Sequence, residues 1–387
     1  MRAAGDRGDQ TFKPRPRLGA VMRDRVKRIF AHAKTPVDTI LLMNSVEPLL
    51  DKALLYATDV ASGMFEGCVA VGFPDGALTL FSSELEAESA RATPELTVET
   101  FSTRADQAEK IRKALSGTPR VGLNYHDLTH ENFLHLKKEL PDAEFLDVSD
   151  AVRRARAVKD SREVERLRQA GKIVSRVAEE IPSLLRVGMT ELELAGEMEN
   201  LMNKHGAAGR SFDTIVGFGA HGAEPHFSPT SARLDRGMGI VCDFGALYQR
   251  YCSDLTRSYA FGKPPAELKA IHRKVEEAQQ AALATIRAGV PAKEPHLAAA
   301  KVVDDSPWKG KFNHGLGHSV GLAVHDGFAM NPRTEEVLEA GMVVTVEPGI
   351  YVRGLGGVRI EDDILVTAKG YEFLTTAPRE YFEVGAA

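Results

Sequence analysis

The spacing of apolar residues changes along the chain, and the change predicts two domains. Between residues 18 and 154, short apolar runs typical of strands alternate with segments whose apolar residues recur at helical spacing, which predicts an α/β domain. The charged segment 153–162 has no strand signal and marks the boundary, so residues 155–387 form the second domain. In the first domain we predict strands at 39–43, 77–81, 121–123 and 145–147, helices at 23–33, 106–115 and 128–140, and further apolar runs at 53–57 and 68–72.

The second domain begins with two helices whose starts are well defined. Asp160-x-x-Glu163 and Thr190-x-x-Glu193 are capping boxes, and each precedes apolar residues on one helical face. We expect Pro182 and Gly188 to end the first helix and Gly206 to end the second.

Strand patterns dominate the centre of the second domain. Two apolar runs, 239–244 and 251–259, flank a turn containing Gly245 and predict a β-hairpin. A strand at 214–218 and a loop rich in Gly, His and Pro at 219–229 precede the hairpin, a helix at 265–288 follows it, and the remainder is predicted as strands and loops. Strands gathered in the middle with helices covering them make an α+β domain.

Composition narrows the class of protein. A chain of 387 residues with 43% hydrophobic and 27% charged residues is typical of a globular protein with two domains. The net charge of −5 offers no basic surface for a phosphate backbone, so we expect no nucleic-acid partner. We also expect no membrane association and a cytoplasmic location, because long apolar runs and a signal-peptide core are absent from the sequence. Residues 1–17, rich in Arg, Gly, Pro and Asp, are expected to form a loose, disordered tail.

Each arm of the predicted hairpin carries one acid among apolar and aromatic residues. Asp243 follows Ile240, Val241 and Cys242, and Asp254 precedes Leu255. An ionised carboxylate in such company requires a positive partner, either a distant basic side chain or a cation bound by both acids. The simpler alternative is that Asp254 caps a turn or pairs with Arg257.

A glycine-rich stretch, Phe312 to Asp326, contains three histidines. Glycines let the backbone pass close to a ligand, and neutral imidazole is a common ligand of transition metals. His318 is our candidate ligand, and His314 and His325 are better suited to hydrogen bonding with a substrate or an intermediate, although the sequence alone does not rank the three.

Two later apolar strands each carry an acid. Glu347 ends the run 341–347 and shares a strand face with Thr345, and Glu361 shares a face with Arg359. An ion pair between Arg359 and Glu361 is the structural alternative.

Four acids and one imidazole in separate apolar segments suit a dinuclear cation site. Four converging carboxylates would repel one another strongly unless cations neutralise them. Such a ligand set favours Mn²⁺, Co²⁺ or Zn²⁺. The five residues are Asp243, Asp254, His318, Glu347 and Glu361.

From about Ala157 onward, this ordered set resembles metallopeptidase family M24, which has the pita-bread fold and includes prolidase, aminopeptidase P and methionine aminopeptidase. The resemblance implies that Asp243 binds one metal ion, that His318 and Glu347 bind the other, and that Asp254 and Glu361 bridge both. Because the whole set is present, the metal-free creatinase branch and a non-catalytic peptide-binding role are disfavoured.

The same resemblance implies a mechanism. Two ions, Mn²⁺ first among the candidates, would share a water and generate the attacking hydroxide, and Glu347 would pass a proton to the leaving amine. His226, His314 and His325 resemble the substrate-side histidines of the family and would steady the oxyanion or the departing nitrogen. Arg359, in Gly-Val-Arg-Ile-Glu, is expected to orient Glu361 or the substrate.

The N-terminal domain resembles that of the members that cleave Xaa-Pro bonds, where it narrows the entrance to the site. The resemblance implies small proline-containing peptides as substrates and a homodimer as the assembly. Ala329 stands where the dipeptidases commonly carry an Arg for the substrate carboxylate. Either Arg333 or a basic residue of the N-terminal domain replaces it, or longer peptides are accepted as in aminopeptidase P; we favour a dipeptidase.

Overall fold

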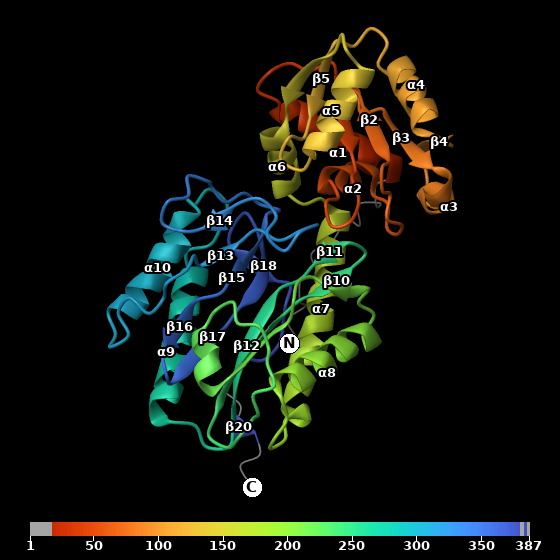
Figure 1. Cartoon of the computed structure of the whole chain (residues 1–387). Coiled ribbons are helices and arrows are strands. Elements are labelled where there is room, and N and C mark those ends of the chain that lie inside the picture. The colour runs from red at the N-terminus through yellow and green to blue at the C-terminus, as the bar shows by residue number, and fades with distance from the viewer. Residues whose placement is uncertain (1–17, 380–382, 385–387) are drawn as a thin grey trace, which may run out of the picture. The chain divides into compact units, whose positions relative to one another are not determined.

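The computed structural model describes residues 18–379 and 383–384, and the chain divides into two compact units between Ser149 and Asp150 (Figure 1). The tail predicted at residues 1–17 lies outside the described residues. The boundary predicted at 154/155 falls five residues later than this division, inside helix α6 (Ser149–Ala157). Buried Ala151, Val152 and Ala155 lie on one face of α6, and the arginines between them conceal this spacing in the sequence.

The first unit is a six-stranded sheet with helices, in the strand order β4-β3-β2-β1-β5-β6. Strand β1 pairs parallel with β5 and antiparallel with β2, and β5 continues parallel into β6. Its elements are α1 (Leu18–His32), β1 (Thr39–Met43), α2 (Lys52–Thr58), β2 (Val69–Gly72), β3 (Leu78–Ser83), η1 (Glu84–Glu86), α3 (Ala87–Arg91), β4 (Thr97–Phe101), α4 (Arg104–Ala114), β5 (Arg120–Leu123), α5 (His130–Glu139) and β6 (Glu144–Asp147). The predicted strands and helices are confirmed here, the apolar run at 53–57 forms α2, and the run at 68–72 forms β2.

The helices of the second unit begin where the capping patterns predict. Both capping boxes form: Asp160 caps α7 (Ser161–Leu184) with Glu163, and Thr190 caps α8 (Glu191–Lys204) with Glu193. Helix α7 continues two residues past Pro182, which has no N–H for the Ala178 carbonyl oxygen, and the Tyr259 hydroxyl donates to that oxygen at 2.9 Å. Helices α9 (Ala266–Leu283) and α10 (Lys293–Asp304) follow later in the chain.

Helix α10 contradicts the prediction that only strands and loops follow residue 288. It begins at Ala292 without a side-chain cap, so the usual start signal is missing. Its buried His296, Ala299 and Val303 nevertheless recur at helical spacing.

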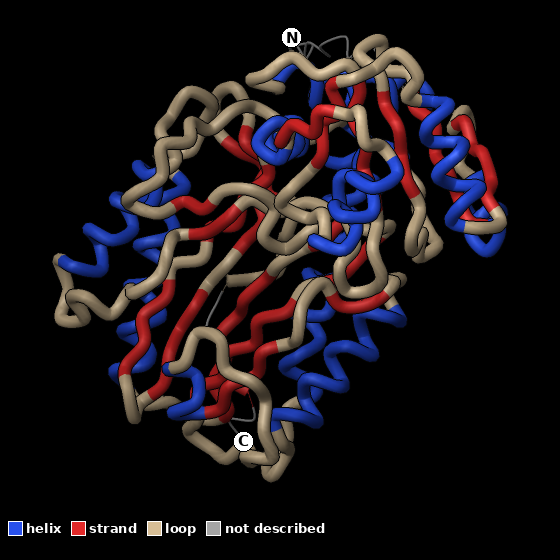
Figure 2. The backbone as a smooth tube through the Cα atoms, turned by 45° about the horizontal axis from the view of Figure 1, so that its top comes forward, coloured by secondary structure: helices blue, strands red, loops and turns tan. Residues whose placement is uncertain are grey.

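The strands of the second unit lie between the two helix pairs (Figures 1 and 2). Helices α7 and α8 pack on the half that contains β8, β9 and β12, and α9 packs on β15, β16 and β17. The elements are β7 (Gly209–Arg210), β8 (Ile215–Phe218), η2 (Gly219–Ala223), β9 (Gly239–Phe244), β10 (Ala246–Tyr248), β11 (Tyr251–Cys252), β12 (Leu255–Phe261), β13 (Gly317–His318), β14 (Ala329–Met330), β15 (Val343–Val346), β16 (Gly349–Val352), β17 (Gly356–Arg359), β18 (Asp362–Val366), β19 (Tyr371–Phe373) and β20 (Glu383–Val384).

The predicted hairpin exists, but its turn lies elsewhere. Strand β9 pairs antiparallel with β12, with Asp243 opposite Thr256, and the chain turns at Gln249 and Arg250, which have φ values of 44° and 72°. Gly245 is needed for a different reason: a Cβ there would lie 2.0 Å from the carbonyl oxygen of Ser253.

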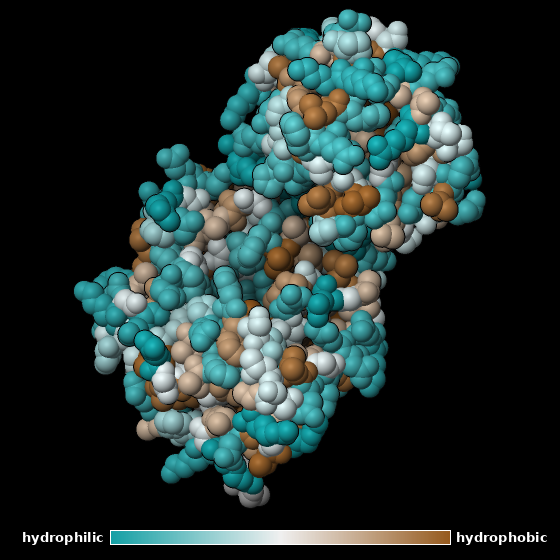
Figure 3. Space-filling model, in the orientation of Figure 1, coloured by the Kyte–Doolittle hydropathy of each residue, from teal (hydrophilic) through white to brown (hydrophobic). Residues whose placement is uncertain are grey.

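On the face seen in Figure 3, hydrophilic residues predominate and hydrophobic ones occur in small groups. None of the helices within residues 18–379 combines the length and apolarity that crossing a bilayer requires.

Candidate metal centre

The five residues singled out as ligands come from five separate segments of the second unit. Asp243 lies near the end of β9, Asp254 directly precedes β12, and His318 lies on β13. Glu347 follows β15, and Glu361 stands between β17 and β18. The ends of paired strands therefore supply all four acids.

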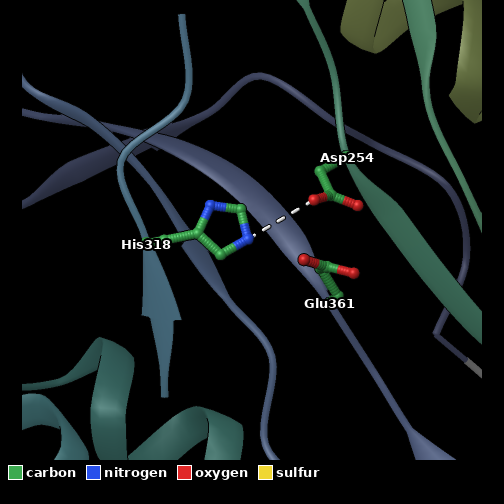
Figure 4. A group of neighbouring side chains, drawn as sticks. All are labelled: Asp254, His318 and Glu361. Atoms are coloured by element: carbon green, nitrogen blue, oxygen red, sulfur yellow. Dashed lines mark ion pairs between the residues drawn. The ribbon is translucent and has the colours of Figure 1, made fainter. Parts of the chain in front are cut away.

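Three of these side chains form a compact group (Figure 4). Ligand atoms of Asp254, His318 and Glu361 all lie within 4.8 Å of one another, and the imidazole and the carboxylates point toward one another in Figure 4. The His318 Nε2 atom is 3.5 Å from Asp254 Oδ2 and 3.5 Å from Glu347 Oε1. Asp254, His318 and Glu361 can therefore reach a shared cation, and Glu347 adjoins this group through His318.

Two of the acids present buried oxygens that lack a donor. Asp243 Oδ1 and Asp254 Oδ1 are inaccessible to water and accept no hydrogen bond from the described residues. The predicted alternative, an Asp254–Arg257 pair, is wrong, since Arg257 instead pairs with Asp362 at 2.8 Å. Buried acceptors without donors are costly, and a cation is the partner that carboxylate oxygens fit. The residues present thus fit divalent metal ions.

The pKa shifts of the clustered acids also show that their ionised forms need a nearby positive charge. Burial, with Glu361 and Asp243 nearby, raises the pKa of Asp254 well above its ordinary value. Burial, with Glu347 and Asp243 nearby, likewise raises the pKa of Glu361, and burial raises the pKa of Glu347 to about 8. Burial lowers the pKa of His318 to about 3, so its imidazole is neutral and able to bind a metal at physiological pH.

Arg359 is anchored to the centre through Asp243. Its guanidinium donates to Asp243 Oδ2 at 2.6 Å, to the Tyr351 hydroxyl at 2.9 Å and to Thr256 Oγ1 at 3.0 Å. Thr256 in turn donates to Glu361 Oε2 at 2.6 Å. Among the described residues the ion pair of Arg359 is with Asp243, not with Glu361, so the predicted Arg359–Glu361 pair is wrong and the two are linked through Thr256.

The predicted histidines line a cavity of about 360 Å³. His226, His314 and His325 are in its wall together with His318, Asp243, Glu347 and Arg359. His314 Nδ1 lies 2.7 Å from the Gly315 carbonyl oxygen, to which it can only donate, so its Nε2 accepts from the Tyr351 hydroxyl at 2.9 Å. Both ring nitrogens of His314 are thus engaged within the protein, which favours His226 and His325 for contact with a ligand.

A close backbone approach positions His318. A Cβ on Gly317 would lie 2.1 Å from the Thr345 carbonyl oxygen, so only glycine fits there. Thr345 Oγ1 accepts the His318 N–H at 3.0 Å and donates to Glu347 Oε1 at 3.3 Å. The contact confirms the predicted shared face of Thr345 and Glu347.

Sequence reasoning missed the buried polar residues behind the centre. Asp363 Oδ2 accepts the Asp254 N–H at 2.9 Å, and Arg257 donates to the Glu361 carbonyl oxygen at 2.6 Å. Glu191, in the first turn of α8, accepts a hydrogen bond from the Phe218 N–H and lies within hydrogen-bond distance of His221 Nδ1, and both residues precede His226. Gln279 on α9 could have been found, because it is a polar residue on the apolar face formed by Val275, Ala278 and Ala282.

The fold and these residues agree with the comparison to known families. The model of metallopeptidase family M24 matches residues 165–368, and that of the creatinase/prolidase N-terminal domain matches residues 23–158. The chain belongs to metallopeptidase family M24.

Individual relatives are similar over nearly their whole length. The chain is 34% identical to the Xaa-Pro dipeptidase of Pyrococcus horikoshii over 93% of this chain and 99% of that one. It is also similar to the structure of an X-Pro aminopeptidase from Thermotoga maritima (TM-score 0.86, 33% identity, 93% and 100% of the two chains). A third relative is the structure of an Xaa-Pro dipeptidase from Bacillus anthracis (TM-score 0.85, 32% identity, 94% and 99%). The predicted fold, a pita-bread catalytic domain after a smaller α/β domain, is confirmed.

Proposed function

We propose that this metallopeptidase is an Xaa-Pro dipeptidase that hydrolyses the bond before proline in dipeptides. The observation that carries the proposal is the pair of buried oxygens, Asp243 Oδ1 and Asp254 Oδ1, beside the cluster of Asp254, His318 and Glu361. The relatives named for this activity support the choice of substrate.

Two divalent ions suit the donor set, with Mn²⁺ first and Co²⁺ or Zn²⁺ as alternatives. One imidazole with four carboxylates is a mainly oxygen ligand set, which favours hard or borderline cations. The ligands proposed are Asp243, Asp254, His318, Glu347 and Glu361. When bound, such ions supply Lewis acidity and lower the pKa of water toward neutrality.

Residues of the cavity wall are then expected to bind the peptide and to transfer protons during its hydrolysis. Glu347 lies in the cavity wall, and we expect it to accept a proton from water and donate it to the leaving amine. His325 lines the cavity, and burial lowers its pKa, which favours the neutral imidazole. As a neutral hydrogen-bonding group it can stabilise the tetrahedral oxyanion. His226 lies in the same wall and shares this role. Arg359 holds Asp243 in place and, through Thr256, Glu361.

The test compares metal content with peptide hydrolysis. D254N and E361Q should lose both bound Mn²⁺ and Xaa-Pro turnover, because each removes a charged oxygen from the cluster. D305N, the same kind of change at an exposed residue after α10, should keep both. If protein stripped of metal by a chelator keeps full Xaa-Pro turnover, the proposal fails.

Substrate length is tested separately. Ala329 is exposed and lines the cavity, and the guanidinium of Arg359 in the same wall already pairs with Asp243. Comparing kcat/KM for Xaa-Pro with that for Xaa-Pro-Yaa across Mn²⁺, Co²⁺ and Zn²⁺ distinguishes a dipeptidase from an aminopeptidase P. The dipeptide should be preferred; preference for the tripeptide contradicts the dipeptidase assignment.

Assembly and location are also part of the proposal. A homodimer, as the family resemblance implies, is checked by light scattering of the purified protein. A cytoplasmic location accords with the three buried free thiols of Cys68, Cys242 and Cys252.

A further inference from the structure

Gln279 is a polar side chain in the apolar core of the second unit. It lies on α9 and is 2% exposed. Its side-chain amide nitrogen lies within hydrogen-bond distance of three acceptors, which share its two hydrogens: the carbonyl oxygens of Val346 at 3.1 Å and Ile360 at 3.3 Å, and Asp362 Oδ2 at 3.0 Å. All three partners are acceptors, so the orientation of the amide is fixed by chemistry. One side chain thus binds the backbone immediately before both Glu347 and Glu361.

The strands that carry these glutamates need such a link because their ladder is weak at this point. Strands β15 and β18 pair as far as Val346 with Asp362, and β16 and β17 pair from Gly349 with Arg359. The register is continuous, which places Glu347 opposite Glu361 and leaves two like charges facing each other across the strands.

Neither glutamate is hydrogen-bonded to the other strand through its backbone N–H. The Glu347 N–H donates to the Leu316 carbonyl oxygen at 2.8 Å, and the Glu361 N–H donates to the Thr256 carbonyl oxygen at 3.2 Å. These bonds point away from the strand pair, as in a non-hydrogen-bonded antiparallel pair, whose side chains lie closest together.

The next pair along the register contains a proline. Ile360 donates its N–H to the Pro348 carbonyl oxygen at a long 3.4 Å. Proline has no N–H to donate in return, so the Ile360 carbonyl oxygen needs a donor from outside the ladder. The Gln279 amide is that donor.

We propose that Gln279 is a positioning residue that fixes the separation of Glu347 and Glu361 for metal binding. By bonding to Val346 on one strand and to Ile360 on the other, its amide holds the strands where repulsion between the glutamates would part them. The inference rests on the proposed function, because it takes both glutamates as metal ligands. Residues that orient metal ligands typically change metal affinity by about 10- to 100-fold when they are replaced.

The test measures Mn²⁺ binding to metal-free protein by calorimetry, with stability followed by urea unfolding. In Q279M the side chain keeps its length and loses its donor. The matched control is I271V, a conservative change at a fully buried residue of the same helix. Q279M should bind Mn²⁺ about tenfold or more weakly than wild type while the metal-free protein stays folded, and I271V should bind within about twofold of wild type.

Each outcome decides the question. Equal Mn²⁺ affinity in Q279M and I271V overturns the inference, since Gln279 then acts only through packing. If Q279M does not fold, Q279N, which keeps the amide one methylene further back, takes its place; failure of both to fold also overturns the inference. If wild-type protein binds no Mn²⁺, the proposed function fails, whereas Mn²⁺ binding to wild type and undiminished binding to Q279M refute only the role of Gln279.

Discussion

Replacing Glu191 by Gln tests how the loop that carries His226 is held. Glu191 is fully buried at the start of α8. Its Oε1 accepts the Phe218 N–H at 2.9 Å and lies 2.8 Å from His221 Nδ1, and its Oε2 accepts the N–H and the hydroxyl of Thr230 at 3.0 and 2.6 Å. One carboxylate therefore ties together both ends of the segment between Phe218 and Thr230.

The expected loss can be worked out from these four bonds. In E191Q one carboxylate oxygen becomes an NH₂ group, which cannot accept, so two of the four bonds are lost whichever way the amide turns. Hydrogen bonds to a charged group contribute about 1.5–3 kcal/mol each. If the amide NH₂ faces Thr230, the hydroxyl can rotate and accept from it, and if it faces His221, Nδ1 can accept in the other tautomer, so part of the loss is recovered either way. We expect the free energy of unfolding of E191Q to be about 2–4 kcal/mol lower than that of wild type.

Activity should fall because His226 loses its position, and a double-mutant cycle tests this route. E191Q should lower kcat/KM for Xaa-Pro by about 10- to 100-fold, which corresponds to about 1.4–2.8 kcal/mol. In an H226A background the same change should lower kcat/KM by less than about twofold, because the residue it positions is already gone.

E193Q is the matched control for this experiment. Glu193 stands two residues later in the same helical turn, accepts the Thr190 N–H at 2.7 Å and is not part of the cavity wall. Its replacement should leave kcat/KM unchanged. The reasoning is refuted if the free energy of unfolding of E191Q lies within about 0.5 kcal/mol of the wild-type value. It is also refuted if E191Q lowers kcat/KM as much in the H226A background as in the wild-type background.

Three further predictions concern the pH dependence, the first unit and the backbone of the site. Burial lowers the pKa of His272 to about 4 from an ordinary 6.5, so between these pH values the unfolded chain binds more protons than the folded one. The free energy of unfolding therefore falls as the pH drops from 6.5 toward 4. In H272Q this fall, measured by urea unfolding at pH 7 and 4.5, should be smaller by up to about 3 kcal/mol, and an unchanged fall would contradict the prediction. Arg25 pairs with Asp59 at 2.9 Å, and both side chains are about 1% exposed. R25M should therefore lower the free energy of unfolding of the first unit by about 3–5 kcal/mol, measured as a lower melting temperature. An unchanged melting temperature would contradict this prediction. G317A should push His318 away from Thr345 and weaken Mn²⁺ binding in calorimetry by about tenfold or more, and wild-type affinity would show that the backbone can yield.

Local signals made much of the fold predictable. Capping boxes at Asp160 and Thr190 determine two helix starts through contacts within four residues, and such contacts can be recognised in the sequence. Helix α10 lacks a cap of this kind and was missed. The turn at Gln249 and Arg250 was also missed, because neither residue type favours the positive φ it adopts.

Asp243, Asp254 and Glu347 could be anticipated because each is the single acid of an apolar segment, and Glu361 because it ends the apolar run Gly357 to Ile360 beside Arg359. The partners of those acids could not, since these contacts join segments far apart in the chain. Arg359 pairs with Asp243 across 116 positions, and Gln279 reaches Val346 across 67. A pattern within one strand placed Arg359 beside Glu361, whereas the tertiary fold turned it toward another strand.

The contacts of Arg257 have a consequence for biosynthesis. This buried guanidinium donates to the carbonyl oxygens of Ala377 and Pro378, both at 2.7 Å, as well as to that of Glu361. A nascent chain therefore cannot complete the surroundings of Glu361 until residue 378 has left the ribosome, although Asp243 and Asp254 emerge more than a hundred residues earlier.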